Sequence, residues 1–376
     1  MEFLHYIKKN NENILQTYHQ LHTLAEPSWE EKNTSHYLAG RLKQAGFIVK
    51  TFPNHFGIIA EIPGESDQVI ALRADMDALV QEVDSVVKPN HSCGHDAHST
   101  MVLYAALSLA SSGMKPKHTL RFIFQPAEEK GEGALQMIKD GALQNVSMLF
   151  GIHVRPNVEV PFMKASPVII HGAAGTIKGT IKGLQAHASR PQDGINAIEA
   201  AALLIQKLKE IDLITKTPYS IKMTQLQTEN AATNVIPETA TFSIDARAQT
   251  NETMNELKSM TKKIMEQTME ESGAAINWSM EEFVPAASVH QSAIKIVETA
   301  IIDELGKENL IPATVSQGGE DFHFYTVDNP DLAATMVGLG CDLSPGLHHP
   351  QMKFNLDALQ YGANILIRTI LLALEE

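Results

Sequence analysis

The chain has 376 residues, more than the roughly 250–300 at which a single hydrophobic core usually stops growing, so we expect two domains. Hydrophobic residues make up 44% of the chain and charged residues 20%, a composition that excludes a disordered or fibrous protein. The formal net charge of −14 disfavours nucleic acid and anionic membrane surfaces as partners, and no cluster of basic residues opposes it.

The cysteine content and the apolar stretches indicate where the protein works. Cys93 and Cys341 cannot form a disulfide framework, and the first residues lack the apolar run of a secretion signal, so we expect a cytoplasmic protein. The most apolar stretches, residues 101–110 and 365–374, are shorter than the roughly 20 residues that span a bilayer. We therefore expect no membrane segment.

The first part of the chain alternates between helix and strand. Two helices are predicted within the first forty-odd residues, followed by short β-rich runs at 47–52, 56–62 and 69–73. The pattern then gives helix 99–111, strand 120–124, helix 134–139 and strand 148–154. This alternation favours an α/β fold in which a sheet carries helices on its faces.

The pattern changes between about residues 167 and 283. Long alternating strands are predicted at 176–181, 219–226 and 240–246, with amphipathic helices at 195–211 and 252–271. The α/β pattern then returns, with strands at 313–316 and 333–339 and a closing helix at 355–374. We therefore predict a discontinuous α/β domain of residues 1–166 and 284–376, with a central mixed sheet, interrupted by an inserted α+β domain of residues 167–283.

Side chains that can bind a metal ion follow almost every strand of the predicted sheet. They are Asp75 and Asp77, then Cys93, His95, Asp96 and His98, then Glu128 and Glu129, then His153, and finally His348 and His349. Loops beyond the carboxyl ends of such strands form the sites of open α/β sheets. Any one of these residues alone would more often be an ordinary surface or core residue, but their joint placement indicates a metal centre.

The mixture of ligand types indicates which metals the centre takes. Cys, His and Glu together suit zinc, manganese, cobalt or nickel better than magnesium or calcium. The set is too large for one catalytic zinc ion, so we predict two divalent metal ions about 3.5–4 Å apart that share a bridging ligand and a bridging hydroxide. Of the adjacent Glu128 and Glu129, one would bind metal and the other would act as general base.

Eight stretches, in order along nearly the whole chain, resemble the motifs of the dinuclear metallo-amidohydrolases and exopeptidases. This family includes aminoacylases, hippurate hydrolases, auxin-conjugate hydrolases and N-acetyldiaminopimelate deacetylases. The stretches are RADMDAL (73–79), CGHDAH (93–98), FQPAEE (124–129), GIH (151–153), AH (186–187), NVIP (234–237), GGEDF (318–322) and LHH (347–349).

The resemblance assigns roles within the metal centre. It implies that Glu128 is the general base. The implied metal ligands are Glu129 and His348 for one ion and His95 and His153 for the other, with the Cys93 thiolate as the bridge. Where the wider family has a His-x-Asp metal motif, this chain has Asp75-Met76-Asp77. We therefore expect Asp75 and Asp77 to orient the ligands and not to bind metal themselves.

The resemblance also assigns roles to the inserted domain. It implies that this domain is a lid through which the chain forms a homodimer. His187 would enter the active site of the partner subunit and polarise the scissile carbonyl. Asn234, Arg247 and the backbone of Gly319 would receive the carboxylate of the substrate.

These observations predict an amidohydrolase that cleaves the amide bond of N-acyl amino acids. A dipeptidase or carboxypeptidase that uses the same centre on a peptide bond is an alternative. A Cys93 nucleophile with His95 as base would leave the surrounding carboxylates and histidines without a role. A metal-binding or regulatory protein that has lost catalysis would have no reason to keep Glu128.

Overall fold

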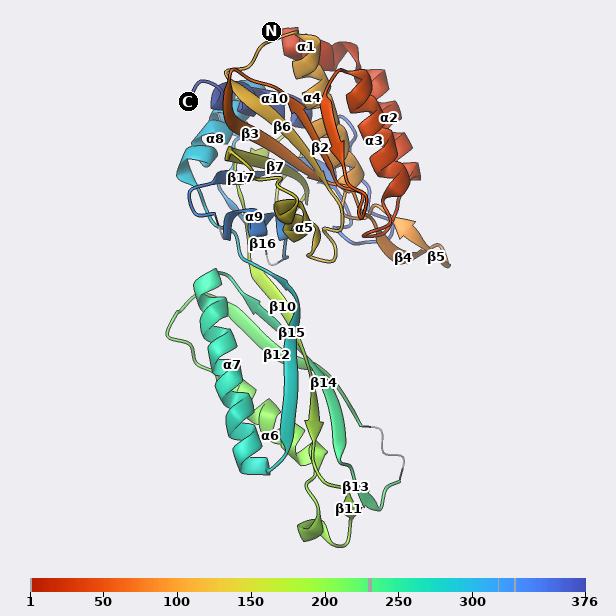
Figure 1. Cartoon of the computed structure of the whole chain (residues 1–376), viewed down its shortest axis with the longest axis vertical. Helices are drawn as coiled ribbons and strands as arrows, with labels where there is room; N and C mark the ends of the chain where they lie inside the picture. The colour runs from red at the N-terminus through yellow and green to blue at the C-terminus, as the bar shows by residue number, and fades with distance from the viewer. Residues whose placement is uncertain (1, 229–231, 317, 328) are drawn as a thin grey trace. The chain divides into compact units, whose positions relative to one another are not determined.

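The computed structural model describes residues 2–228, 232–316, 318–327 and 329–376, which form two compact units (Figure 1). The large unit comprises Met1–Ile170, Ser288–Val315 and Asp321–Glu376. The inserted unit comprises His171–Ala287 and Ser316–Glu320. The predicted fold class, an α/β domain interrupted by an α+β insertion, is confirmed.

The large unit is built on a seven-stranded mixed sheet with the strand order β1-β2-β6-β3-β7-β17-β8. The strands in this order are Ile48–Thr51, Ile58–Ile62, His118–Gln125, Ser66–Asp75, Val146–Pro156, Ala333–Leu343 and Ala165–Ser166. Strands β6, β3, β7 and β17 are parallel to one another, whereas β1, β2 and β8 pair antiparallel at the two sides. The four central strands therefore present their carboxyl ends at one edge of the sheet.

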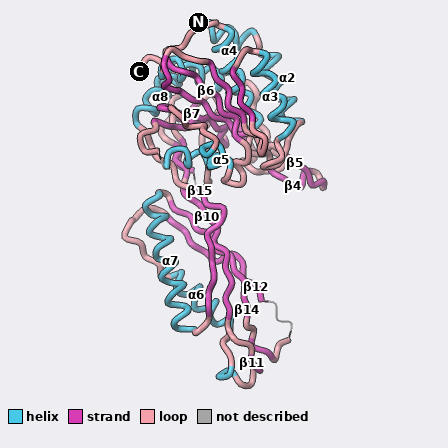
Figure 2. The backbone as a smooth tube through the Cα atoms, in the orientation of Figure 1, coloured by secondary structure: helices cyan, strands magenta, loops and turns pink. Residues whose placement is uncertain are grey.

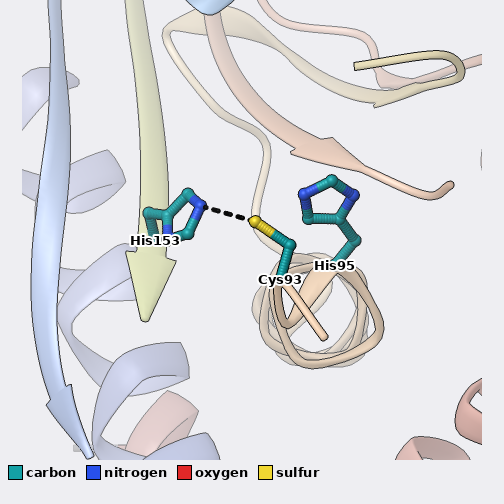
Figure 3. Close-up of side chains that lie close together, drawn as sticks. All are labelled: Cys93, His95 and His153. Atoms are coloured by element: carbon teal, nitrogen blue, oxygen red, sulfur yellow. Dashed lines mark hydrogen bonds between the residues drawn. The ribbon is translucent and has the colours of Figure 1, made fainter. Parts of the chain in front are cut away.

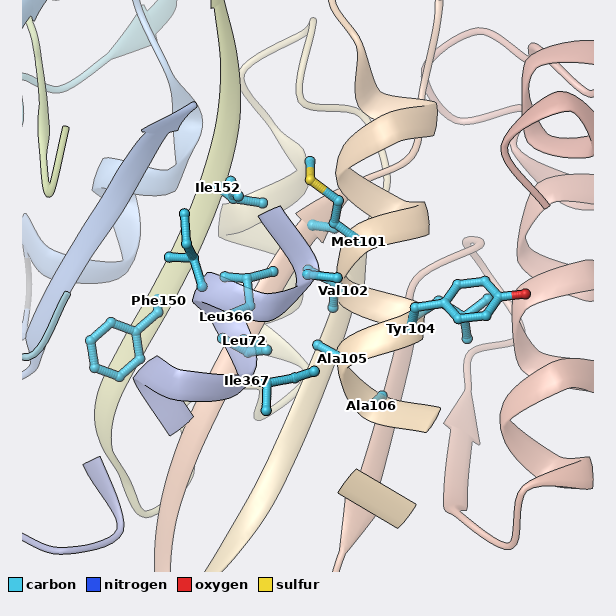
Figure 4. Close-up of a cluster of buried hydrophobic side chains, with 14 of the residues drawn as sticks. Leu72, Met101, Val102, Tyr104, Ala105, Ala106, Phe150, Ile152, Leu366 and Ile367 are labelled. Carbon is cyan, nitrogen blue, oxygen red and sulfur yellow. The ribbon is translucent and has the colours of Figure 1, made fainter. Parts of the chain in front are cut away.

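The helices of the large unit pack on this sheet or on the other helices around it. They are α1 (Glu2–Lys9), α2 (Asn11–Thr23), α3 (Lys32–Gln44), α4 (His95–Ser111), α5 (Gly133–Lys139), α8 (Gln291–Leu305), α9 (Phe324–Val327) and α10 (Ala358–Ala373). Leu72 of β3 and Ile152 of β7 belong to one buried cluster with Met101 of α4 and Leu366 of α10 (Figure 4). Each such buried side chain contributes about 1.5–3 kcal/mol to stability. This core fixes the start of α4 against the ends of β3 and β7.

Two features of the large unit differ from the predicted elements. Helix α4 begins at His95 and not near residue 99, because the polar residues of its first turn conceal the helical period in the sequence. Strands β4 (Leu79–Val83) and β5 (Val86–Asn90) form a hairpin that the pattern did not predict. Short 3₁₀ helices occupy Lys307–Asn309 and Asp321–His323. Among the described residues, no helix is both long and apolar enough to cross a membrane.

The inserted unit contains a four-stranded antiparallel sheet with the order β12-β14-β10-β15 (Figure 2). These strands are Tyr219–Thr228, Thr239–Ala248, Ala173–Lys182 and Ala275–Val284. Helices α6 (Ala197–Lys209) and α7 (Asn251–Ser272) pack on the sheet through a core that includes Ile177, Phe242 and Ile244. Alternate strand residues supply this core, as expected for a sheet covered on one face.

The remaining elements of the inserted segment are short. A small pair, β11 (Ala186–His187) and β13 (Val235–Ile236), lies beyond the end of β10, with the 3₁₀ helix Pro191–Asp193 next to it. Strands β9 (Ile169–His171) and β16 (Thr314–Ser316) pair where the chain passes from one unit to the other. The chain therefore enters and leaves the inserted unit at the end of the sheet where β10 begins.

Candidate metal centre

The large unit brings the predicted metal-binding side chains together at the carboxyl edge of the central strands. Asp75 ends β3 and Asp77 follows it, Glu128 and Glu129 follow β6, His153 lies near the end of β7, and His348 lies in the loop after β17. Helix α4 begins at the same edge with His95, two residues after Cys93. Figure 3 shows the sulfur of Cys93 directed at the ring of His153, with His95 on the other side.

The sulfur of Cys93 lies at the middle of this cluster. Its Sγ atom is 3.7 Å from His153 Nε2 and 3.3 Å from His348 Nε2. The possible ligand atoms of Cys93, His95 and His153 lie within 4.8 Å of one another, and so do those of Cys93, Glu129 and His348. Two groups of three ligand atoms therefore share one thiol.

His95 is oriented by Asp77. Its Nδ1–H donates to the carbonyl oxygen of Asp77 at 2.9 Å and lies 3.1 Å from Asp77 Oδ1. Its Nε2 is buried, has no hydrogen-bond partner among the described residues, and lies 3.8 Å from a carboxylate oxygen of each of Glu128 and Glu129. A histidine held through Nδ1 in this way presents Nε2 as a metal ligand.

His153 and His348 also turn their Nε2 atoms toward the sulfur of Cys93. The Nδ1–H of His153 donates to the carbonyl oxygen of Val154 at 2.7 Å, which leaves Nε2 facing Cys93. Burial and the neighbouring His98 hold the pKa of His153 well below its ordinary value, and burial also lowers the pKa of His348. Both imidazoles are therefore neutral near pH 7, with a lone pair available on Nε2.

The two glutamates leave strand β6 through a turn. Ala127, directly before them, has a positive φ of 52°, and the backbone N–H of Glu129 donates to Asp77 Oδ2 at 3.0 Å. Glu129 Oε1 is buried without a hydrogen-bond partner among the described residues, and its Oε2 lies 3.6 Å from His348 Nε2. Glu128 Oε1 accepts from the backbone N–H of Asp321 at 3.4 Å. Both glutamate side chains are about nine-tenths buried.

These residues fit a pair of divalent cations. His95 Nε2 and Glu129 Oε1 are buried polar atoms whose lack of a partner within the described chain is costly unless a cation or water satisfies them. Thiolate, imidazole and carboxylate are the donors that zinc and similar divalent ions take in proteins. The cluster can therefore hold two such ions with Cys93 common to both.

A second layer of buried polar residues surrounds the cluster. Asp75 accepts from Arg73 Nη1 at 2.6 Å and from His98 Nδ1 at 2.8 Å, and His98 Nε2 accepts from the backbone N–H of Val154 at 3.0 Å. Burial would raise the pKa of Asp75, but the charges of His95, His98 and Arg73 outweigh it and hold the pKa well below its ordinary value. Asp75 is therefore linked through His98 to the strand that carries His153. It forms no hydrogen bond with a predicted metal ligand among the described residues.

Sequence reasoning did not single out the residues that support Asp75. Asp321 accepts from Arg73 Nη2 at 2.8 Å, from Gln125 Nε2 at 2.8 Å and from the backbone N–H of Ala134 at 2.9 Å. Arg73 is 1% exposed. An arginine inside an otherwise apolar strand was the available signal, because such a charge is buried only when carboxylates pair with it.

Asp96 and His349, which the sequence places among the possible metal-binding side chains, are not part of the cluster around Cys93. Asp96 is buried but accepts from His22 Nδ1 at 2.7 Å and from the backbone N–H of Ala97, on the other side of the first turn of α4. His349 is exposed, and its Nδ1 accepts from the backbone N–H of Gln351 at 3.1 Å. Neither belongs to the ligand groups around Cys93.

The inserted unit places its predicted site residues in two separate groups. His187 lies on β11 opposite Val235, and the backbone N–H of Ala188 donates to the carbonyl oxygen of Asn234 at 2.9 Å. Both His187 and Asn234 are exposed, and the Nδ1 atom of His187 accepts from the backbone N–H of Ser189 at 3.1 Å.

Arg247 and Gly319 lie at the other end of the same sheet. Arg247 pairs in register with Ala174, near the start of β10, and forms an ion pair with Asp245 at 3.0 Å. A Cβ on Gly319 would lie 3.6 Å from the Cβ of Ala174 and only 2.4 Å from Val284 Cγ2, so this position requires glycine. From Ala174 to the end of β10 the strand runs about 26 Å at about 3.3 Å per residue. Figure 1 shows β11 beyond that far end of β10.

Comparison with known proteins gives a family and several relatives. The model of Peptidase family M20/M25/M40 matches residues 71–372. An IAA-amino acid hydrolase of Arabidopsis thaliana is 30% identical over 363 residues, covering 92% of this chain and 82% of the relative. An N-acetyl-L-cysteine deacetylase of Bacillus subtilis is 29% identical over 349 residues, covering 90% of this chain and 83% of the relative.

A solved structure agrees with the fold. A Bacillus subtilis dinuclear metal binding peptidase from the M20 family has a TM-score of 0.82 at 26% sequence identity, covering 98% of this chain and 99% of that chain. These matches confirm the resemblance that the ordered motifs predicted.

Proposed function

We propose that this chain, which belongs to peptidase family M20/M25/M40, is a metal-dependent amidohydrolase that cleaves the amide bond of N-acyl amino acids. The observation that carries the proposal is the cluster around the buried Cys93, in which two groups of ligand atoms lie beside the carboxylate of Glu128. The names of two relatives, an N-acetyl-L-cysteine deacetylase and an IAA-amino acid hydrolase, describe removal of an acyl group from an amino acid. In this proposal the large unit is the catalytic domain.

The chemistry divides between the metal centre and the residues of the chain. Two divalent ions held by Cys93, His95, Glu129, His153 and His348 supply, when bound, a Lewis acid for the scissile carbonyl and a lowered pKa for the attacking water. Glu128 takes the proton of that water and returns it to the nitrogen of the leaving amine. The backbone N–H of Asp321, 3.4 Å from Glu128 Oε1, holds the carboxylate in place between the two transfers.

We propose that the inserted unit is a lid and that its two groups of residues serve different subunits. A single N-acyl amino acid cannot contact both ends of a strand that runs about 26 Å. Arg247 and the backbone of Gly319 would bind the substrate carboxylate from the end of the sheet where the chain joins the large unit. His187 would donate a hydrogen bond to the oxyanion in the partner's active site.

This arrangement changes the group to which Asn234 is assigned. The resemblance groups Asn234 with Arg247 and Gly319, but Asn234 lies beside His187 in the inserted unit. We therefore assign Asn234 to the group that reaches the partner's active site. A symmetric dimer formed through the inserted unit gives both active sites the same composition.

The experiment that tests the proposed activity is a substrate screen of protein loaded with zinc, manganese, cobalt or nickel. N-acetyl and N-benzoyl amino acids should release free amino acid, chelator should abolish the release, and added metal should restore it. Turnover of dipeptides without turnover of the N-acyl compounds would show that the centre serves a peptidase. Full metal content without turnover of either class would favour a protein that has lost catalysis.

A further inference from the structure

Glu31 is a buried glutamate that the mechanism above does not use. The residue is 0% exposed, and its Oε1 accepts from the backbone N–H of Ala127 at 2.8 Å and from that of Trp29 at 3.0 Å. Its Oε2 is buried and has no hydrogen-bond partner among the described residues. Burying a carboxyl group with one oxygen unpaired is unfavourable, so packing alone does not explain a glutamate here.

The hydrogen bond that the backbone N–H of Ala127 donates to Glu31 lies at a strained point of the backbone. Ala127 ends the connection from β6 and directly precedes Glu128, and its φ of 52° lies in the left-handed region that alanine rarely adopts. The direction in which Glu128 and Glu129 leave the strand depends on this residue. A buried acceptor on the N–H of Ala127 opposes relaxation of the backbone toward an ordinary φ.

Two neighbours of Glu31 are also linked to this segment, Trp29 directly and Ser28 through Asp77. Ser28 Oγ–H donates at 2.6 Å to Asp77 Oδ2, the oxygen that accepts the backbone N–H of Glu129. The indole N–H of Trp29 donates to Glu132 Oε2 at 2.8 Å. The turn at residues 28–31 therefore contacts the glutamate segment directly at Ala127 and Glu132, and reaches Glu129 through Asp77.

We propose that Glu31 is a positioning residue, whose carboxyl oxygen holds the Ala127 backbone so that Glu128 points at the attacking water. Glu31 forms its hydrogen bonds with backbone amides outside the ligand cluster, so its effect passes through Ala127. The inference rests on the proposed function for the role of Glu128. The hydrogen bond itself can be measured without any substrate.

Two conservative variants separate the position of the acceptor from its charge. Glu31→Gln keeps an acceptor oxygen at the same reach but removes the ionisable carboxyl, whose pKa burial raises to about 7. Glu31→Asp keeps the charge but withdraws the acceptor by one methylene, so the 2.8 Å bond to Ala127 is lost. We expect the Gln variant to keep kcat within about threefold of wild type. We expect the Asp variant to lose about 10- to 100-fold in kcat with KM nearly unchanged, because small displacements of a catalytic group have effects of this size.

Hydrogen exchange of the peptide that contains Ala127 provides the measurement that needs no activity. The Ala127 amide should exchange faster in Glu31→Asp than in wild type or Glu31→Gln, both with metal loaded and after chelation. The matched control is Glu26→Asp. Glu26 accepts the backbone N–H groups of Asn33 and Thr34 at the start of α3, and the same shortening there removes a helix cap without touching the Ala127 segment.

The outcomes decide between positioning, charge and general stability. Slow Ala127 exchange in Glu31→Asp, or a Gln variant impaired as much as the Asp variant, would overturn the proposal. A loss of kcat in Glu26→Asp equal to that in Glu31→Asp would overturn it too, because it would trace the loss to the fold. Absence of turnover in the wild type would refute the proposed function, while the exchange data would still report on the hydrogen bond.

Discussion

The candidate residues of the large unit and those of the inserted unit are held in contrasting ways. Around Cys93, His95 and His153 each have Nδ1 hydrogen-bonded to a backbone carbonyl and Nε2 turned toward the glutamates or the sulfur, and the more exposed His348 turns its Nε2 toward the sulfur. In the inserted unit, the side chains of His187 and Arg247 are exposed, and each makes a polar contact with a residue two positions away. Most of the first set is held by the chain before anything binds, whereas under the proposed function the second set finds its long-range partners outside its own sheet.

The two sets of residues differ in the free energy that it costs to leave them without a ligand. Buried polar atoms such as His95 Nε2 are costly until a ligand satisfies them, so the large unit gains stability from binding a cation. The exposed residues of the inserted unit carry no such cost. Loss of a large-unit residue should therefore change metal content or chemistry within one subunit, whereas the proposed role of His187 predicts that its loss can be repaired by another subunit.

The largest expected effect comes from separating the adjacent glutamates. Glu128→Gln should lower turnover by about 10²- to 10⁴-fold while both metals remain, because it removes the general base but no ligand. Glu129→Gln should lose metal as well as turnover. Metal content measured by elemental analysis beside kcat distinguishes the two variants. Near-normal turnover of Glu128→Gln with full metal content would mean that the base is another group.

His187 should have the next largest effect. His187→Ala should lower turnover by about 100- to 1000-fold with the metals retained, because it removes one donor to the oxyanion. Mixing it with Glu128→Gln under conditions of subunit exchange should restore about a quarter of wild-type activity, since about half of the dimers are mixed and each has one complete site. Absence of recovery after demonstrated exchange would place the action of His187 within its own chain or exclude it.

Metal binding should depend on pH through the buried ligands of the large unit. Burial, and then the charge of Glu129, raise the pKa of the Cys93 thiol well above its ordinary value, and burial also raises the pKa of Glu129. Because the pKa of Glu129 is raised to about 7, both groups hold protons in the metal-free protein below about pH 7, and binding must displace them. Affinity should rise with pH by about tenfold per unit for each proton displaced. Titration in weakly buffered solution should show acid release, and a pH-independent affinity would contradict this account.

The smallest expected effect concerns the accessibility of the two thiols. Cys93 should resist alkylation when metal is bound and become reactive after chelation, faster at higher pH because its free thiol has a raised pKa. Cys341 serves as the internal control: it is 0% exposed, burial raises its pKa to about 12, and its labelling should stay slow throughout. Equal labelling of Cys93 with and without metal would reject it as a ligand.

The sequence predicts the fold class well because hydrophobic periodicity reflects burial. Strand β7 is mostly a run of consecutive buried residues and helix α10 buries most of its apolar residues, and both appear close to their predicted ranges. The start of α4 was missed because His95 and Asp96 are polar residues buried by specific partners, which periodicity reads as a loop. The β4–β5 hairpin was missed because its strands are largely exposed and carry little hydrophobic pattern.

The ligand cluster could be anticipated because carboxyl ends of parallel strands converge and metal-competent residue types are distinctive. Its supports could not, since their roles arise from contacts between distant segments. Asp321 reaches Arg73 across 248 positions of sequence, and Glu31 reaches Ala127 across 96. Neither pair has a local pattern, and only the fold brings them within hydrogen-bond distance.

The discontinuity of the large unit has a consequence for synthesis on the ribosome. Strand β7 emerges long before its neighbour β17, because the entire inserted segment is translated between them. During that interval one side of β7 offers unpaired backbone groups, and His348 does not yet exist to complete its ligand group. The edge of β7 is therefore open to edge-to-edge association until the last tenth or so of the chain appears, and the proposed ligand group of Cys93, Glu129 and His348 can form only then.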